Sequence, residues 1–230
     1  MQKRVMQIVN QIQDRKLRSL VRELVSNPTL SSAPANIRGM GLPVSISPAG
    51  KTQHHSYPKG LLEHIISTAK VALALCDSVE EIYRGRVNRD LVLAGVLLHD
   101  IFKPMTYVEK ENGTYGPSPL GERLNHLTLA LCELYKRKAP IELLHIIASH
   151  HGRSGPISPK TIEALIVHVA DVADATLNGE VLKAAKFLVS ECTGEEVTFT
   201  SSKEAFEIVY AKQSEGCEGV KKALEKMRRT

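Results

Sequence analysis

The 230-residue chain contains no tryptophan, and its aromatic residues together make up 4% of the sequence. So few aromatic side chains argue against a broad platform on which the bases of single-stranded nucleic acid stack. No apolar run reaches the roughly 18 residues that a membrane-spanning helix needs. The first residues, MQKRVMQIVNQIQDRK, lack the uninterrupted apolar core of a signal peptide. We therefore expect a cytoplasmic protein that does not interact with a membrane.

Cysteine is also scarce. The four cysteines, Cys76, Cys132, Cys192 and Cys217, are widely separated and form neither a CxxC pair nor a dense disulfide framework. Cys76 and Cys132 lie in apolar helical contexts, where a free cysteine behaves as a small hydrophobic residue. Structural roles are therefore expected for these two cysteines.

The charge balance is mildly basic, with a net charge of +5 and a pI of about 9.0. This excess favours anionic partners such as nucleotides or nucleic acid, although a lysine-rich surface on an ordinary soluble protein gives the same balance. Hydrophobic residues make up 43% and charged residues 24%, which is typical of a globular protein. The chain is long enough to bury a core of its own.

Helical periodicity dominates the chain. Apolar residues over 5–25 fit an amphipathic helix with a break near Asp14, and 26–53 is rich in serine, proline and glycine without periodicity. The pattern is strongly helical over 58–175. We predict an all-α helical bundle with three parts: an N-terminal helix and irregular wrapping segment (1–53), the core (54–178), and a small, mostly helical C-terminal appendage (179–230).

Local signals place several boundaries. Asn88 is a candidate N-cap for the apolar helix that leads to His99, and Ser158 followed by Pro159 is a candidate start for the helix that contains Asp171. The segment VEKENGTYGPSPLG predicts a polar loop or short hairpin. In the appendage, EVLKAAKFLVSEC predicts a helix and EVTFT a short β-branched stretch.

Nine histidines all lie between Gln53 and Val169, several of them in otherwise apolar helices. A buried imidazole is costly unless hydrogen bonds or a metal satisfy its nitrogens. The sharpest case is the pair His99-Asp100, which directly follows LVLAGVLL. An ionised aspartate at the end of a buried helix needs a strong cationic partner, and a divalent metal is one. An exposed helix end with ordinary polar caps is the alternative interpretation.

Two further polar residues occupy apolar helices. His64 lies among leucines and isoleucines, and Asp171 lies in ALIVHVADVADA. Inward-pointing histidines and carboxylates on facing helices are how bundles assemble metal centres. Such ligands suit Mn²⁺, Fe²⁺, Co²⁺, Ni²⁺ or Zn²⁺. His126 and the pair His150-His151 are candidates for a second metal position.

These residues carry a resemblance to a known family. Seven of them follow the H…HD…H…H…D pattern of HD-domain phosphohydrolases: His64, His99, Asp100, His126, His150, His151 and Asp171. The strings HHSYPKGLLEH, VNRDLVLAGVLLHDIFK, ASHHG and EALIVHVADVADA look like the HD domain of the YhaM-type 3′–5′ exoribonucleases, over about Leu17 to Ala175. The sequence departs from that subgroup in having a short helix and loop where its members carry an N-terminal OB-fold domain.

The resemblance implies roles for the matching residues. One metal would be held by His64, His99, Asp100 and Asp171. Asp100 would bridge to a second metal on His126 and His150, with His151 as the alternative ligand to its neighbour. Lys103 matches the lysine of the family's HDxxK motif and would neutralise a substrate phosphate; a solvated lysine at a helix end is the alternative.

Other polar residues lie near this pattern. His54 and His55 either contact a substrate phosphate or cap and pack a turn. Arg153 either adds positive charge beside the site or is a solvated loop residue. Glu63 is a candidate for orienting an imidazole. For His145 and His168 we expect packing or indirect hydrogen bonding, and we expect Asp174, one turn past Asp171, to be a helix-face carboxylate.

We therefore expect a metal-dependent phosphohydrolase. One or two divalent ions, Mn²⁺ first among them, would activate water and polarise the phosphoryl group, with Lys103 offsetting developing charge. The leading substrate hypothesis is RNA or a short oligonucleotide, hydrolysed from its 3′ end. A phosphohydrolase of a small or cyclic nucleotide is the enzymatic alternative, and a non-catalytic nucleotide-binding module is the alternative of another class. The sequence leaves a homo-oligomer open.

Overall fold

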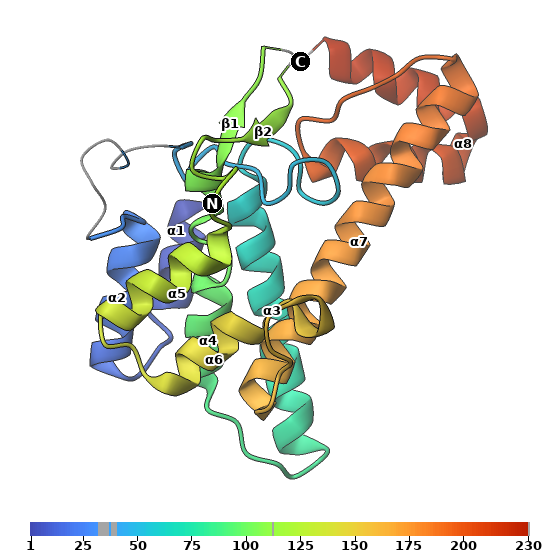
Figure 1. The fold of residues 1–230 in the computed structure, drawn as a ribbon. Coiled ribbons are helices and arrows are strands. Elements are labelled where there is room, and N and C mark those ends of the chain that lie inside the picture. Colours follow the sequence, from blue (N-terminus) through green and yellow to red (C-terminus); the bar gives the residue numbers. More distant parts are fainter. Residues whose placement is uncertain (32–36, 38–40, 112, 230) are drawn as a thin grey trace.

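The computed structural model describes residues 1–31, 37, 41–111 and 113–229. Figure 1 shows a helical bundle from which one long helical hairpin projects. The bundle contains α1 (Gln2–Val9), α2 (Arg15–Ser26), α3 (Gly60–Glu81), α4 (Arg89–Leu98), α5 (His126–Lys136) and α6 (Ile141–Ser149). The hairpin consists of α7 (Ile162–Thr193) and α8 (Ser202–Arg228), and the first half of α7 packs in the bundle. The predicted all-α fold is confirmed.

Short elements complete the architecture. Two 3-10 helices, η1 (Lys103–Thr106) and η2 (Gly152–Ser154), follow α4 and α6. The strands β1 (Tyr107–Glu109) and β2 (Tyr115–Pro117) pair antiparallel, so the predicted short hairpin is confirmed. None of the helices in the described part of the chain is long and apolar enough to cross a membrane.

The helix α4 lies at the centre of the bundle, in contact with α1, α2, α3, α6 and α7. Its residues from Val92 to Leu98 are all buried, as expected of a helix that is apolar on every face. Gly95 lets α4 lie close to α6, because a Cβ at this position would lie only 2.5 Å from Cγ2 of Ile146 on α6. This packing fixes the end of α4, where His99 and Asp100 follow.

Caps set the helix starts, and one predicted start is wrong. Asn88 caps α4 by accepting from the backbone N–H of Leu91, as predicted, and Asp14 caps α2 at the predicted break. In contrast, α7 begins at Ile162 with Thr161 as its N-cap, three residues beyond Ser158. The backbone N–H of Lys160 donates to Nε2 of His145 on α6, which holds this segment against α6 outside a helix.

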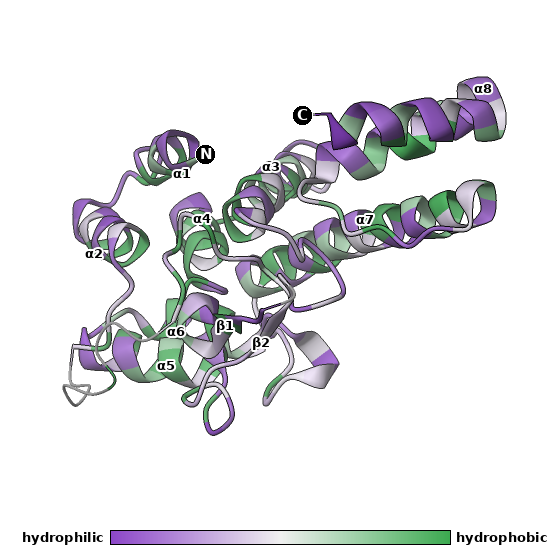
Figure 2. Ribbon diagram, turned by 90° about the horizontal axis from the view of Figure 1, so that it is seen from above, coloured by the Kyte–Doolittle hydropathy of each residue, from purple (hydrophilic) through white to green (hydrophobic). Residues whose placement is uncertain are grey.

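The helix predicted around Asp171 and the helix predicted after Gly179 are one continuous helix, α7. Its second half packs against α8 around a small separate core that contains Leu182, Ala185, Val189 and Ile208. Figure 2 shows α7 and α8 extending together beyond the other helices. The stretch EVTFT forms no strand, and its Phe199 is buried in this core. The boundary expected at residue 178 falls inside α7 and stays a prediction.

A disulfide between Cys192 and Cys217 links the end of α7 to α8 beside Gly216, whose φ of 63° kinks α8. The sequence does not indicate this pair, because its residues are 25 positions apart and meet only through the hairpin. Of the other cysteines, Cys76 is buried as expected. Cys132 is exposed, so it does not pack as the small hydrophobic residue that its apolar helical context predicted.

Candidate metal centre

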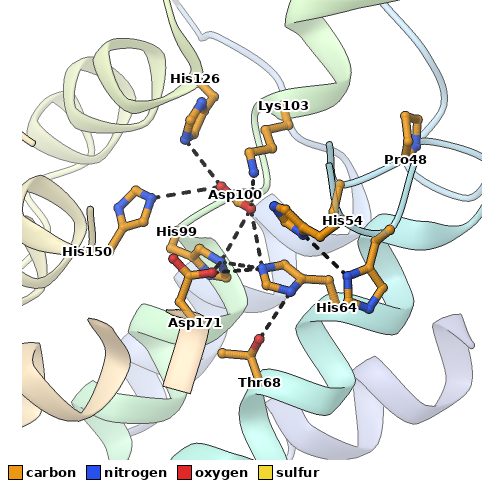
Figure 3. A network of polar contacts seen from close by, with 12 residues as sticks. Pro48, His54, His64, Thr68, His99, Asp100, Lys103, His126, His150 and Asp171 are labelled. Carbon is orange, nitrogen blue, oxygen red and sulfur yellow. Dashed lines mark hydrogen bonds and ion pairs between the residues drawn. The ribbon is translucent and has the colours of Figure 1, made fainter. Parts of the chain in front are cut away.

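Five helices deliver the predicted ligands to one place. His99 and Asp100 follow α4, His64 lies on α3, Asp171 on α7, His126 at the start of α5, and His150 directly after α6. Figure 3 shows the side chains converging on Asp100. The structure thus brings together residues up to 107 positions apart in the sequence, as the pattern predicted.

The first group lies on one side of Asp100. Nε2 of His64 is 3.1 Å from Nε2 of His99 and 3.1 Å from Oδ1 of Asp171. Oδ2 of Asp100 lies 3.4 Å from Nε2 of His99 and 3.6 Å from Nε2 of His64. His64, His99 and Asp171 each offer an atom close enough to hold one ion.

The second group lies on the other side, around His126, His150 and His151, which also offer atoms for one ion. Oδ1 of Asp100 is 3.2 Å from Nε2 of His126 and 3.9 Å from Nε2 of His150. The ring of His151 lies beside that of His150, with centroids 4.0 Å apart and the two planes tilted by 53°. Asp100 therefore directs one oxygen at each group, as a bridging ligand would.

Hydrogen bonds fix the tautomers of three histidines. Nδ1–H of His99 donates to the carbonyl of Val96 (2.8 Å), and Nδ1–H of His150 donates to that of Ile147 (2.7 Å). Nδ1–H of His64 donates to Oδ2 of Asp174 (2.6 Å). In the neutral ring the lone pair then lies on Nε2, which faces the centre in each case.

Three buried atoms at the centre have no hydrogen-bond partner among the described residues: Oδ1 of Asp100, Nε2 of His126 and Nε2 of His150. Buried polar groups are costly without a partner. A divalent ion would satisfy all three, and their nitrogen and oxygen donors suit such ions. The residues present therefore fit a metal on each side of Asp100.

The electrostatics favour the ionisation state that binds metal. Burial would raise the pKa values of Asp100 and Asp171, but nearby cationic and hydrogen-bonding groups, Lys103 and His99 for Asp100 and His64 for Asp171, hold both well below the usual range. Burial lowers the pKa of His126 and of His150 to about 3. The aspartates are therefore ionised and these two imidazoles neutral near pH 7.

His64 differs from the other histidines. Burial lowers its pKa, but hydrogen bonds with Asp171 and Asp174 outweigh that effect and raise the pKa to about 9. In the metal-free protein a proton on Nε2 is therefore held between His64 and Asp171. A metal at this place has to displace that proton, so metal binding releases it.

Lys103 is buried, with 8% of its surface exposed, and its Nζ lies 2.6 Å from Oδ2 of Asp100. The alternative of a solvated lysine is therefore wrong. Burial lowers the pKa of Lys103, but the carboxylate of Asp100 raises it to a net value above normal. The ammonium is charged and lies beside the metal-ligating oxygens, and its contact with a substrate phosphate stays a prediction.

The three other residues predicted to contact substrate lie in different surroundings. The ring of His54 faces that of His64, with centroids 5.1 Å apart. His55 is buried in the turn before α3 with a φ of 44°, and its backbone N–H donates to Oδ1 of Asn178. Arg153 is exposed on η2 and makes no hydrogen bond or ion pair with the described residues.

The structure changes two expectations about residues that lie beside the ligands. Asp174, expected only to be a helix-face carboxylate, is buried, and its carboxylate accepts from Nδ1–H of His64. The signal was its spacing, because positions three apart on α7 share the face toward α3. The side chain of Glu63 bonds Ser202 on α8 instead of orienting an imidazole. His168 does take the expected indirect role, since its Nδ1–H donates to the carbonyl of His150.

The family model for the HD domain matches residues 61–176, just over half of the chain. The chain belongs to the HD-domain family. The predicted resemblance is confirmed, and the protein is a metal-dependent phosphohydrolase. Members of this family bind divalent metals, which agrees with the two ligand groups around Asp100.

Relatives of this HD-domain protein include a phosphodiesterase and exoribonucleases. It is 47% identical over 175 residues to the dihydroneopterin 2′,3′-cyclic phosphate phosphodiesterase of Methanocaldococcus jannaschii, covering 76% of this chain and 69% of that protein. It is 34% identical over 152 residues to the 3′-5′ exoribonuclease YhaM of Listeria monocytogenes (60% and 46%), and 33% over 144 residues to YhaM of Bacillus subtilis (57% and 43%). The chain thus spans less than half the length of these YhaM relatives. No solved structure matches.

Proposed function

We propose that this HD-domain protein is a phosphodiesterase that opens the cyclic phosphate of a small heterocyclic substrate, of the type of dihydroneopterin 2′,3′-cyclic phosphate. The observation that carries the proposal is the 47% identity to an enzyme of that name over three quarters of the chain. The ligand groups on both sides of Asp100 support it, because phosphodiester hydrolysis is chemistry that paired metals promote.

The residues of the chain divide the work. Divalent ions bound by the two ligand groups would polarise the phosphoryl oxygens and lower the pKa of water toward neutrality. Asp100 stays ionised and holds Lys103 in place through its Oδ2. The ammonium has three N–H donors, of which Asp100 takes one, so the others are available to a phosphoryl oxygen. That contact offsets negative charge as the phosphate ring opens.

His54 supplies the remaining group beside the ligands. Burial lowers its pKa to about 4, so its ring is neutral near pH 7. A neutral imidazole both donates and accepts a hydrogen bond. We assign to His54 a contact with the substrate on the side of Asp100 opposite His126 and His150 (Figure 3).

Hydrolysis of RNA or short oligonucleotides from the 3′ end is the second candidate. The 33–34% identity to YhaM exoribonucleases favours it. Both candidates use the same ligand groups and the same lysine, so they differ in what surrounds the centre. A non-catalytic nucleotide-binding module would be expected to lack ligands, whereas this site retains all seven predicted metal-site residues.

One experiment separates the two candidates. Purified protein is freed of metal, reloaded with Mn²⁺, Fe²⁺ or Ni²⁺, and given dihydroneopterin 2′,3′-cyclic phosphate, 2′,3′-cyclic nucleotides and an end-labelled oligoribonucleotide. We expect ring opening of the cyclic phosphates to monoesters, dependent on added metal, with the oligoribonucleotide intact. Stepwise shortening of the oligoribonucleotide without ring opening would replace the proposal with the second candidate.

A further inference from the structure

A cavity of about 570 Å³ lies beside the metal centre, between the segment before α3 and the middle of α7. Its walls are Thr52, Gln53 and His54 on one side and residues from Ala175 to Lys186 of α7 on the other. Cavities of roughly 300–1,000 Å³ are the usual size for small-molecule sites. Apart from His54, none of the described residues with a role at the metal centre lines this cavity.

The cavity and the metal centre share a wall. His54 lines the cavity, and its ring also faces the ligand His64. On α7, Asp171, Ala175 and Gly179 follow one another at intervals of four residues, so they lie along one face of the helix. Eight residues of α helix span roughly 12 Å. A molecule whose phosphate lies at the centre can therefore reach the cavity with its other end.

The wall before α3 is held firmly. The backbone N–H of His55 donates to Oδ1 of Asn178 (2.6 Å), and Nδ2 of Asn178 donates to the hydroxyl of Tyr57 (3.0 Å). The two walls lie within van der Waals distance at Gly179, since a Cβ there would lie 3.5 Å from the carbonyl oxygen of Gln53. A preformed cavity of this kind binds a rigid group with little loss of conformational entropy.

The lining indicates the class of ligand. Ala175 and Leu182 give an apolar surface, and Thr52, Gln53 and Thr176 give neutral polar groups. Glu180 adds a carboxylate, whose pairing with Lys183 is loose and exposed at 3.9 Å. Such surface pairs hold a side chain weakly, so the carboxylate is free to accept from a ligand. A carboxylate accepts two parallel N–H groups well.

We propose that this cavity binds the planar heterocycle of the substrate and that Glu180 accepts the N–H edge of a 2-amino-4-oxopyrimidine ring. Pterins and guanine share that edge, and adenine lacks it. The inference rests on the proposed function, whose substrate class it narrows. Lys183 and Lys186, at the same cavity, border the bound ring.

The test uses two variants of the full-length protein. Gly179→Leu fills the cavity, and Glu180→Gln removes the charged acceptor. Gly179→Ala is the matched control for the first, because its methyl group meets only ordinary contacts. Glu196→Gln, an exposed position after α7, is the control for the second. All four are compared with the unchanged protein in circular dichroism before use.

Two measurements are made. The first is the ratio of kcat/KM for 2′,3′-cyclic GMP to that for bis(p-nitrophenyl) phosphate, which carries no such heterocycle. We expect Gly179→Leu and Glu180→Gln to lower this ratio about tenfold or more, the scale of one hydrogen bond to a charged group. We also expect Glu180→Gln to abolish a preference for 2′,3′-cyclic GMP over 2′,3′-cyclic AMP. The second is the Kd of neopterin and of guanosine for the metal-free protein, which both variants should raise.

The outcomes are distinct. No hydrolysis of dihydroneopterin 2′,3′-cyclic phosphate, of 2′,3′-cyclic GMP or of bis(p-nitrophenyl) phosphate by the metal-loaded, unchanged protein would remove the proposed function itself. Hydrolysis with an unaltered ratio in both variants would overturn the cavity assignment and leave that function standing. An oligoribonucleotide that binds more tightly than guanosine, through Lys183 and Lys186 and independently of Glu180, would also overturn it in favour of an RNA path. The neopterin and guanosine measurements separate a pterin from a purine preference.

Discussion

The two halves of α7 contrast sharply. The first half lies in the bundle and carries Asp171 and Asp174, whose carboxylates contact the two ring nitrogens of His64. The second half packs on α8 around a small apolar core and is tied to it by a disulfide. The match to the HD domain ends at residue 176, between the two. We call the first half of α7 the chemical half, because it carries residues of the metal centre, and the second half the structural half, because it packs on α8. The cavity beside Gly179 lies where the two halves meet.

The largest effect on the chemical half should come from Asp100→Asn. Its carboxylate faces both ligand groups and pairs with Lys103. An amide has no negative charge to offer to a metal or to the lysine. We expect metal-dependent hydrolysis to fall by more than about 100-fold, since residues behind the ligands already cause losses of 10–100-fold. Elemental analysis should show less bound metal, while circular dichroism shows the same helix content. A variant that keeps both metal and activity would mean that the centre lies elsewhere.

The pH dependence of stability in the metal-free protein should also come from the chemical half. The pKa values of His126 and His150 fall to about 3 in the folded state, so the unfolded chain binds more protons between about pH 6.5 and pH 3. The free energy of unfolding should therefore decrease as the pH falls through that window. The lowered pKa values of Asp100 and Asp171 act in the same direction below about pH 4.

His64 acts in the opposite sense. Its pKa rises to about 9 in the folded state, so its contribution is full below about pH 6.5 and is lost as the pH rises through 9. Urea titrations at a series of pH values would measure the loss of stability both at acid pH and at alkaline pH. Replacing His126 and His150 together by glutamine should make the decrease at acid pH shallower, with the rest due to groups such as His54 and His55, and leave the decrease at alkaline pH unchanged. If stability decreases at acid pH in that variant as it does in the unchanged protein, then other groups cause the decrease.

Asp174→Asn should have a smaller effect. The change weakens the hydrogen bond that orients His64, without removing a ligand. We expect metal affinity to fall by about 10–100-fold, as for other residues that orient ligands. Titration with Mn²⁺, followed by thermal unfolding, would measure it. Glu63→Gln is the control, because that side chain bonds Ser202 and not a ligand. Equal losses in both variants would point to a general effect on α3.

The ligands could be predicted from the sequence because each is a polar residue in an apolar helix. His64, His99 and Asp171 stand out in this way, and their order matches the family pattern. The hydrogen bond between Asp174 and His64 could not be predicted, because it depends on which face of α7 packs against α3. The disulfide could not be predicted because Cys192 and Cys217 are 25 positions apart and meet only where α8 packs on α7. Interactions that depend on long-range docking were therefore the ones missed.

The smallest effect on the metal centre should come from Cys192→Ala, which tests the structural half. The disulfide closes a loop of 25 residues, and in the chain-entropy account such a link stabilises the folded state by about 3 kcal/mol. We expect chemical denaturation to show a loss of that order, while Mn²⁺ affinity stays the same because the centre lies at the other end of α7. The reduced, unchanged protein should behave like the variant. If Cys192→Ala weakens Mn²⁺ binding as strongly as Asp174→Asn does, then α7 transmits the packing of the hairpin to Asp171, and the two halves are one functional unit.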